Sequence, residues 1–313
     1  MSTFVLTFPG QGSQAVGMGK NLAETFPVAR QLFHEADEAL GFRLSTLCFE
    51  GPEKDLQLTA NTQPAILTVS IAALRVLQER IELDVAAVAG HSLGEYSALV
   101  CADALDFADA VRIVRKRGEF MQDAVPPGVG TMAAIIGLDQ HTVAELCTQS
   151  SRAGNLVELA NINSPGQYVV SGHVDAVTNV VELAKEAGAR RALLLPVSAP
   201  FHCELMKPAA NRLEQVLNEV TFNDLKVPLV NNADAAILTK GDELRTSLLR
   251  QMYRSVQWVR SIERLLQDGA DTFIEVGPGK VLSALLRRIE KKAVALNVCD
   301  VNTLEQTVER IKG

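Results

Sequence analysis

The chain has 313 residues, of which 47% are hydrophobic and 21% charged, so it is long enough for one large or two ordinary domains with a sizeable core. The formal net charge of −7 argues against a nucleic-acid partner, because phosphates favour clustered positive charge. No apolar run reaches the ~20 residues that span a bilayer, and no secretory or transit signal is recognised, so we expect no membrane association. The five cysteines are odd in number and form no CxxC pair, which favours a reduced, cytoplasmic location.

Strand-like apolar runs alternate with helical patterns through most of the chain. The clearest predicted strands are residues 4–8, 85–90 and 271–276. The clearest predicted helices are residues 26–40, 65–80, 107–122 and 281–292. This alternation predicts an α/β protein with a mainly parallel sheet.

The middle of the chain has a different order of elements. After a Pro/Gly break at residues 124–130, the predicted order is strand, helix, strand, strand, helix, strand, and the last strand covers residues 190–198. This β-α-β-β-α-β order is typical of a ferredoxin-like unit. We therefore expect a small ferredoxin-like subdomain over 128–196, inserted into a large α/β subdomain formed by 1–127 and 197–313.

The sequence GHSLG, residues 90–94, lies where a predicted strand turns into a helix. A serine between two glycines at such a turn is typical of a nucleophile elbow, where neighbouring Cβ atoms would clash. The alternative is an ordinary turn with a capping serine. An elbow serine also lies at a helix N-terminus, so the Leu93 N–H is a candidate donor to a developing oxyanion. We predict that Ser92 is the nucleophile.

A serine hydroxyl needs a base within reach, and the chain has five histidines. His91 adjoins Ser92, and its side chain is expected to point away from it. The histidines expected on a surface helix, in a helix's first turn and in a turn are His34, His141 and His173.

His202 differs because it follows a predicted buried strand and precedes a helix, and α/β folds place their chemistry in such strand-end loops. We predict His202 as the base, the alternative being a structural core histidine.

No acidic residue near these motifs is an obvious third member of a catalytic triad. Asp268-Gly269-Ala270 resembles the Asp-Gly-Gly/Ala of serine–aspartate dyad lipases. It lies between a predicted helix and a strand, however, where Gly269 also fits a helix C-cap. A serine esterase or lipase-like hydrolase therefore remains an alternative function.

Arg117 is the most informative charged residue of the predicted helix over 107–121. At about 100° per residue, Arg112, Arg115 and Lys116 fall on the solvated side, whereas Arg117 falls at the edge of the buried stripe. A guanidinium there is costly unless an anion meets it, either an internal carboxylate or a bound one. Because the planar fork of arginine suits a carboxylate, an acyl substrate with its own carboxylate would meet this need.

Two glycine-rich segments allow a nucleotide- or CoA-binding module as another alternative. The first, GQGSQA at residues 10–15, is compatible with a dinucleotide fingerprint, but residues 28–40 are predicted as helix where that motif needs a second strand. A loop of this kind can instead lend a backbone N–H to an oxyanion hole, and Gln11 is the candidate. The second, GPGK at 277–280, is too short for a phosphate-binding loop. Cys203, beside His202, is expected to be structural.

Several collinear motifs cover the chain from end to end. They are FPGQGSQ (8–14), GHSLGEYSAL (90–99), RG followed by MQ (117–118 and 121–122), NSPGQ (163–167), PFHCELMKPA (200–209), QWV (257–259) after Gln251, and EVGPGKVLSALL (275–286). Together they resemble the bacterial malonyl-CoA:acyl carrier protein transacylases of type II fatty acid synthesis. The resemblance implies a serine hydrolase-like α/β core with an inserted ferredoxin-like subdomain.

The resemblance also implies roles for individual residues. Ser92 would be the nucleophile and His202 its base, and Arg117 would hold the malonyl carboxylate. Main-chain N–H groups of Gln11 and Leu93 would form the oxyanion hole. A main-chain carbonyl, in place of an acid, would orient the histidine, and Gln251 lies in the matching segment.

Further substrate-binding residues implied by the resemblance are Gln251, Phe201 and Asn163. The Phe201-His202 pair is similar to the end of the H-A-F-H motif of malonyl-selective polyketide acyltransferase domains, although the first histidine of that motif is absent here.

The implied substrates are malonyl-CoA and a holo acyl carrier protein that binds transiently. Coenzyme A and phosphopantetheine would act as substrate carriers, with no resident cofactor or metal, and we expect a monomer. Methylmalonyl transfer or a polyketide role is a further alternative. Because acyl carrier proteins are acidic, we expect a basic patch at the mouth of the site. Its candidate residues are Arg190, Arg191, Arg287, Arg288, Lys291 and Lys292, with Arg112, Arg115 and Lys116; the alternative is that each run is a solvated helix face.

Overall fold

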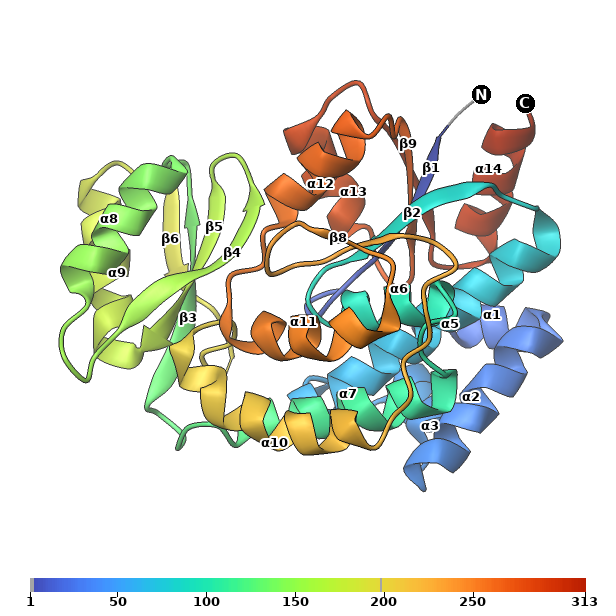
Figure 1. Cartoon of the computed structure of the whole chain (residues 1–313), viewed down its shortest axis with the longest axis horizontal. Helices are drawn as coiled ribbons and strands as arrows, with labels where there is room; N and C mark the ends of the chain where they lie inside the picture. The colour runs from blue at the N-terminus through green and yellow to red at the C-terminus, as the bar shows by residue number, and fades with distance from the viewer. Residues whose placement is uncertain (1–2, 198) are drawn as a thin grey trace.

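A computed structural model describes residues 3–197 and 199–313 of the chain (Figure 1). The described residues form two β-sheets, which are covered by helices. The larger sheet has six strands, and the order across it is β10-β9-β1-β2-β7-β8. In this order the strands are Val294–Val298, Thr272–Val276, Phe4–Phe8, Val85–Gly90, Leu229–Val230 and Ile237–Leu238. All neighbouring strands pair in parallel except β7 and β8, which form an antiparallel edge.

The large sheet is buried on both faces, which is why its strands are continuous apolar runs. Successive residues of β1 point to opposite sides: Val5 packs in a cluster with Trp258 of α12 (Trp258–Gln267), whereas Leu6 packs with Ile66 of α5 (Thr59–Arg80). The helices of this part are α1 (Lys20–Thr25), α2 (Pro27–Leu40), α3 (Leu44–Glu50), α4 (Glu53–Leu56), α5 (Thr59–Arg80), α6 (Gly94–Cys101), α7 (Phe107–Gln122), α10 (Lys207–Asn218), α11 (Gly241–Tyr253), α12 (Trp258–Gln267), α13 (Val281–Ile289) and α14 (Val301–Lys312), with a 3₁₀ turn at Glu204–Met206.

The smaller sheet is antiparallel, with the order β4-β5-β3-β6. Its elements, in chain order, are β3 (Gly130–Ile136), α8 (Gln140–Ser150), β4 (Val157–Ser164), β5 (Gln167–His173), α9 (Val174–Glu186) and β6 (Arg191–Leu194). This is a β-α-β-β-α-β unit with α8 and α9 packed on one face (Figure 1). The expected fold class, a mainly parallel α/β core with an inserted ferredoxin-like unit, is confirmed.

The other face of the small sheet packs against the part of the chain that contains the large sheet. Met132 and Val169 belong to the core cluster of the large part, whereas their neighbours Ala133 and Val170 pack under α8 and α9. The β4 strand is joined to the segment after α11, because Val256 N–H donates to the Ala160 carbonyl over 2.8 Å. The division at 128–196 remains a proposal, and residues 1–2 and 198 lie outside the described ones.

Two expectations about the middle of the chain were wrong in detail. The strand expected over 190–198 is observed only over Arg191–Leu194. Residue 198, the last of the expected range, lies outside the described residues. His173 closes β5 and is the N-cap residue of α9, where a turn was expected. Within the described residues, no helix is long and apolar enough to cross a membrane.

Candidate active site

The turn between β2 and α6 is a nucleophile elbow in its geometry. Ser92 has a φ of 51°, a left-handed conformation that is strained for a residue with a side chain. The flanking glycines are required by crowding: a Cβ on Gly90 would lie 1.9 Å from the carbonyl carbon of Gly94, and one on Gly94 would lie 2.0 Å from the Phe8 oxygen. Only glycine therefore fits at positions 90 and 94. The tight turn that these glycines allow exposes the Ser92 side chain to the cavity at the carboxyl end of β2.

His202 lies directly against this serine. Its Nε2 is 2.7 Å from the Ser92 Oγ, and its Nδ1 is 2.8 Å from the main-chain oxygen of Gln251. Since a carbonyl oxygen can only accept, Nδ1 carries the proton and Nε2 presents its lone pair to the hydroxyl. Burial and the nearby Arg117 charge lower the pKa of His202 to about 3, so the ring is neutral and ready to accept a proton.

His202 follows a strand, as expected, but the expectation that this strand is buried was wrong, because only Ala192 of β6 is buried. The strand that precedes it, β6, is an edge of the small antiparallel sheet and does not belong to the parallel sheet. His202 itself lies in a turn, with a φ of 58°, between β6 and the 3₁₀ turn at Glu204–Met206. It reaches Ser92 because the chain returns from the small sheet to the large one at this point.

Arg117 lies at the bottom of the site and is only 1% exposed. One guanidinium nitrogen donates to the side-chain oxygen of Gln63 over 2.7 Å. The other donates to Gln251 Oε1 over 2.9 Å and to Ser92 Oγ over 3.2 Å. Within the described residues it forms no ion pair with a carboxylate, and its Nε has no partner.

Of the two possibilities for Arg117, an internal carboxylate or a bound one, the first is therefore not found in direct contact. A buried cation whose hydrogen-bond acceptors are all neutral favours the binding of an anion beside it.

A cavity of about 180 Å³ lies above these residues. Its polar lining includes Gln11, Gln63, His91, Ser92, Arg117, Asn161, Asn163 and His202, and its apolar lining is Leu93, Met121, Met132, Val169, Leu195, Val197 and Phe201. Ligand pockets for larger molecules typically measure ~300–1,000 Å³, so this cavity suits a short acyl group. The expected residues Asn163 and Phe201 thus line it, whereas Gln251 lies behind Arg117 and does not.

Two expected oxyanion donors lie at this cavity. Neither the Gln11 nor the Leu93 N–H forms a backbone hydrogen bond within the part of the chain that the structure describes. Unused N–H groups beside a nucleophile are what an oxyanion hole requires. Asn163 comes from β4, where its Oδ1 accepts a 2.8 Å hydrogen bond from His91 Nε2 and so joins the small sheet to the elbow.

Three residues of the site were missed by sequence reasoning. Gln63, in α5, is the first acceptor for Arg117. Asn232 accepts the Ser92 N–H on Oδ1 over 2.6 Å, and Glu95, in the first turn of α6, accepts from Gln251 Nε2 over 3.0 Å. Glu95 had a signal that could have been used, since a carboxylate within an apolar helix face three residues after a nucleophile must have buried partners.

The other candidates lie apart from this site. Asp268 is paired with Arg264 on the surface, and Gly269 has a φ of 95° just after α12, as a helix C-cap requires. Cys203 is buried and donates to the Pro200 carbonyl, and burial raises its pKa to about 12. Such a thiol is protonated at neutral pH and is therefore inert as a nucleophile.

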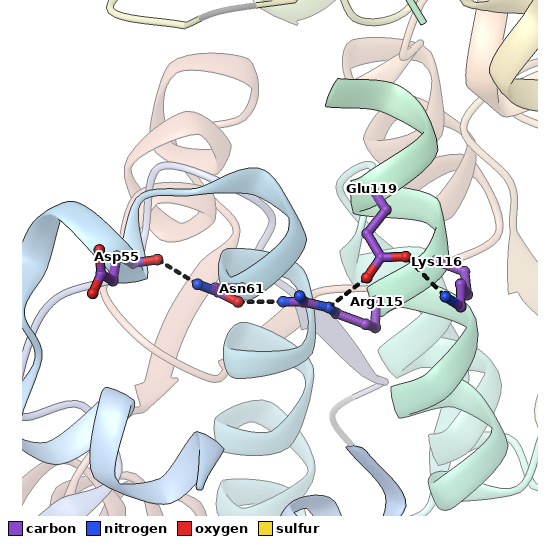
Figure 2. Close-up of polar contacts among 5 residues, drawn as sticks. All are labelled: Asp55, Asn61, Arg115, Lys116 and Glu119. Carbon is purple, nitrogen blue, oxygen red and sulfur yellow. Dashed lines mark hydrogen bonds and ion pairs between the residues drawn. The ribbon is translucent and has the colours of Figure 1, made fainter. Parts of the chain in front are cut away.

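The basic run on α7 is used within the protein. Figure 2 shows Arg115 between Asn61 and Glu119, with Lys116 on the same carboxylate. Arg112 pairs with Asp109 over 3.0 Å. Among the described residues, the other runs form no ion pair; these are Arg190, Arg191, Arg287, Arg288, Lys291 and Lys292. The basic residues of α7 are thus paired with carboxylates, whereas the other runs carry charges without such partners in the described part of the chain.

An elbow serine hydrogen-bonded to a neutral histidine, beside unused N–H donors and a buried guanidinium, fits the class of α/β enzymes that transfer acyl groups through serine. The acyl transferase domain family matches residues 3–306, and the chain belongs to this family and is an acyltransferase. The resemblance drawn from the motifs is thus confirmed.

The chain is similar to proteins of one activity along its whole length. It is 50% identical over 313 residues to the malonyl CoA-acyl carrier protein transacylase of Bacillus subtilis, covering 100% of this chain and 98% of the relative. The solved transacylase of the same name from Coxiella burnetii superposes with a TM-score of 0.97 at 39% identity, covering 100% of this chain and 98% of that one. A malonyl-transacylase solved in complex with a type II PKS acyl-carrier protein superposes with a TM-score of 0.96 at 45% identity, covering 99% and 100%.

Proposed function

We propose that this chain transfers the malonyl group from malonyl-CoA to the phosphopantetheine thiol of acyl carrier protein, through a malonyl-Ser92 intermediate. This transfer would supply the extender unit for fatty acid synthesis. The observation that carries the proposal is the buried Arg117, which lies 3.2 Å from the Ser92 Oγ and has no carboxylate partner among the described residues. A malonyl group has a free carboxylate a short distance from its thioester carbon, so it satisfies the arginine while its carbonyl meets the serine.

The acylation step follows from the hydrogen bonds of Ser92 and His202. His202 Nε2 takes the hydroxyl proton as Ser92 Oγ bonds to the thioester carbon. The N–H groups of Gln11 and Leu93 hold the oxyanion, each worth a factor of roughly 10²–10³ in rate. When the tetrahedral intermediate collapses, the C–S bond breaks and the coenzyme A thiol leaves with the proton from His202.

Transfer to the carrier repeats these steps in reverse. The phosphopantetheine thiol gives its proton to His202, because a free thiol of pKa ≈ 8.5 is mostly protonated at neutral pH. Its sulfur bonds to the ester carbon of malonyl-Ser92; when this tetrahedral intermediate collapses, the bond from that carbon to Ser92 Oγ breaks and His202 returns the proton to Ser92 Oγ. The order is ping-pong. Arg117 holds the acyl carboxylate, which keeps the ester carbonyl in the oxyanion hole and hinders hydrolysis.

The proposal includes the setting of the enzyme. Coenzyme A and phosphopantetheine are substrate carriers and no resident cofactor takes part in these steps. The partners are malonyl-CoA and a transiently bound acyl carrier protein, with no nucleic acid or membrane, and the protein acts as a monomer in the cytoplasm. The buried, free thiols Cys48, Cys147 and Cys203 support a reduced compartment.

A polyketide role is the second candidate, because one of the solved relatives is bound to a type II PKS acyl-carrier protein. The chemistry at Ser92 would be the same. Transfer rates to fatty acid and polyketide carrier proteins, measured side by side, decide between the two roles.

The test of the proposed function is intact-protein mass spectrometry after mixing the protein with malonyl-CoA alone. We expect a stable malonyl adduct on the wild type, discharged by acyl carrier protein, and none on Ser92→Ala. Steady release of malonate without a lasting adduct would instead indicate an esterase. Neither adduct nor turnover would leave only a binding module.

A further inference from the structure

Glu95 is a buried carboxylate to which the mechanism assigns no role. It lies in the first turn of α6 and is 1% exposed. Its Oε2 accepts two hydrogen bonds, from the main-chain N–H of Asn232 over 2.8 Å and from Gln251 Nε2 over 3.0 Å. Its Oε1 has no partner among the described residues. Placing such a group in the interior is costly, so its two contacts call for an explanation.

The hydrogen bond from Gln251 helps to fix the orientation of the Gln251 amide. Its Oε1 accepts from Arg117, and its Nε2 donates to Glu95 and to the Ser92 carbonyl, both over 3.0 Å. A side-chain amide can turn over by exchanging its oxygen and nitrogen. In the turned orientation, an NH₂ group would face the guanidinium and an oxygen would face the carboxylate. Glu95, together with the Ser92 carbonyl, therefore keeps an acceptor directed at Arg117.

The second contact reaches the elbow. Asn232, whose N–H binds Glu95, accepts the Ser92 N–H on Oδ1 and donates from Nδ2 to the Gly90 carbonyl, each over 2.6 Å. Asn232 thus binds the main chain on both sides of the elbow, where the Ser92 backbone is in the left-handed conformation. A backbone in this conformation persists only when its surroundings hold it.

We propose that Glu95 is a positioning residue for acyl transfer: by accepting hydrogen bonds from Gln251 and Asn232 on one oxygen, it fixes Arg117 and the Ser92 elbow relative to each other. The malonyl readout of this inference rests on the proposed function. The role depends on an acceptor at Oε2 and does not depend on the charge. Burial raises the pKa of Glu95 to about 7, and a proton on the unpartnered Oε1 leaves Oε2 free to accept.

Two substitutions separate the acceptor from the charge. Glu95→Gln keeps an oxygen at the same reach and removes the charge, whereas Glu95→Asp keeps the charge and withdraws the oxygen by one methylene. We expect Glu95→Asp to lower kcat/KM for malonyl transfer by roughly 10–100-fold and to reduce the preference for malonyl-CoA over acetyl-CoA. We expect Glu95→Gln to stay within about 3-fold of the wild type in both quantities.

Glu275 provides a matched control. It is equally buried, at 1% exposed, and its carboxylate accepts from the N–H groups of Leu282 and Ser283 over 3.0 and 2.8 Å. Among the described residues, it forms no hydrogen bond with a residue that binds Arg117 or Ser92. Glu275→Asp should lower the thermal unfolding temperature without changing the preference for malonyl over acetyl. A general loss of packing would thus lower the unfolding temperature alone, whereas mispositioning of Arg117 and Ser92 would change the preference for malonyl over acetyl.

The outcomes are distinct. A folded Glu95→Asp with the wild-type preference overturns the inference, and so does a Glu95→Gln that loses as much as Glu95→Asp. If Glu95→Asp does not fold, Glu95→Ala is compared with Glu95→Gln instead. If the wild type transfers no malonyl, the proposed function fails, and the inference is judged from the rate at which a fluorophosphonate labels Ser92. That rate should then fall in Glu95→Asp and persist in Glu95→Gln.

Discussion

The main-chain oxygen of Gln251 lies 2.8 Å from the Nδ1 of His202, at the place that a carboxylate takes in a Ser-His-Asp triad. A carbonyl fixes the tautomer and the ring orientation as a carboxylate does. It has no full negative charge with which to stabilise the imidazolium, however, and Arg117 nearby further disfavours it. His202 is therefore held in the orientation that a base for Ser92 needs, and its ring is only weakly basic.

The low pKa of His202 predicts an unusual pH dependence. A histidine of ordinary pKa loses its base function as pH falls through about 6.5. With its pKa lowered to about 3, His202 stays neutral, so the rate of Ser92 acylation should not decline through that range. Rapid-quench measurement of adduct formation with malonyl-CoA from pH 5 to 8 checks this. An acid limb centred near 6.5 would contradict it.

Arg117→Ala is predicted to lose selectivity more than general activity. Removing hydrogen bonds to a charged group costs about 1.5–3 kcal/mol, so malonyl transfer should fall by roughly 10–100-fold. Transfer of acetyl, which has no carboxylate, should fall less. Arg115→Ala is the control, because Arg115 lies on the same helix and pairs with Glu119 away from the cavity. An unchanged ratio of malonyl to acetyl rates in Arg117→Ala would rule out its role.

Glu95 should make the protein less stable as pH rises. The pKa of Glu95 is raised from 4.5 to about 7 in the folded state, mainly by burial. The Asp234 charge adds to this rise, and the Arg117 charge opposes it. Between these values the unfolded chain ionises while the folded one keeps its proton, so unfolding becomes more favourable. The linkage amounts to about 3 kcal/mol, lost from pH 4.5 to 7.

Glu95→Gln cannot titrate and should lack this loss. Urea unfolding of both proteins at pH 5 and pH 8 checks the prediction. Relative to the wild type, the free energy of unfolding of Glu95→Gln should be higher at pH 8 than at pH 5. The same difference between the two proteins at both pH values would refute the raised pKa of Glu95.

Gly94→Ala is predicted to prevent correct folding of the elbow. Its Cβ would lie 2.0 Å from the Phe8 oxygen, which is backbone of a central strand and cannot give way. We expect a loss of more than about 4 kcal/mol or no soluble protein. Gly188→Ala is the contrast: its φ is 88° but nothing lies within 4 Å, so only the left-handed backbone costs, about 1–2 kcal/mol. Similar unfolding free energies for the two variants would show that crowding is not the cause.

The carrier protein is expected to dock on the exposed basic runs. Gln167 in β5 and Arg191 in β6 flank Ile136 of β3, and Arg288 donates to Gln167, so Arg191 and Arg288 lie at the same end of the small sheet. Arg288→Glu should weaken transfer to acyl carrier protein several-fold at low salt, because complementary charge mainly raises the association rate.

Arg112→Glu serves as the control for this surface. Arg112 is paired with Asp109 on α7, so its replacement should have little effect on transfer. Rates measured at 50 and 500 mM salt complete the test. Transfer that does not respond to salt would count against docking by charge.

Local patterns in the sequence determined the elbow, the buried arginine and the order of the inserted unit. Each depends on neighbours within a few residues: the glycines around Ser92, the helical spacing that places Arg117 at the buried stripe, and the turns that separate the strands of residues 130–194. The position of His202 after a predicted strand indicates it as the base for Ser92, and the collinear motifs added the family and the malonyl carboxylate as the group that Arg117 would hold.

Only the tertiary structure decided what surrounds those residues. Asn232 is 140 residues from Ser92 and follows the two-residue strand β7, which is too short to leave a periodic signal. The acceptors of Arg117 come from α5 and α11, and the return of the chain from β6 is what delivers His202 to the serine. Periodicity reports which face of an element is buried, but the partner on that face depends on sheet order and helix packing. Those are set by contacts between distant segments that no local pattern encodes.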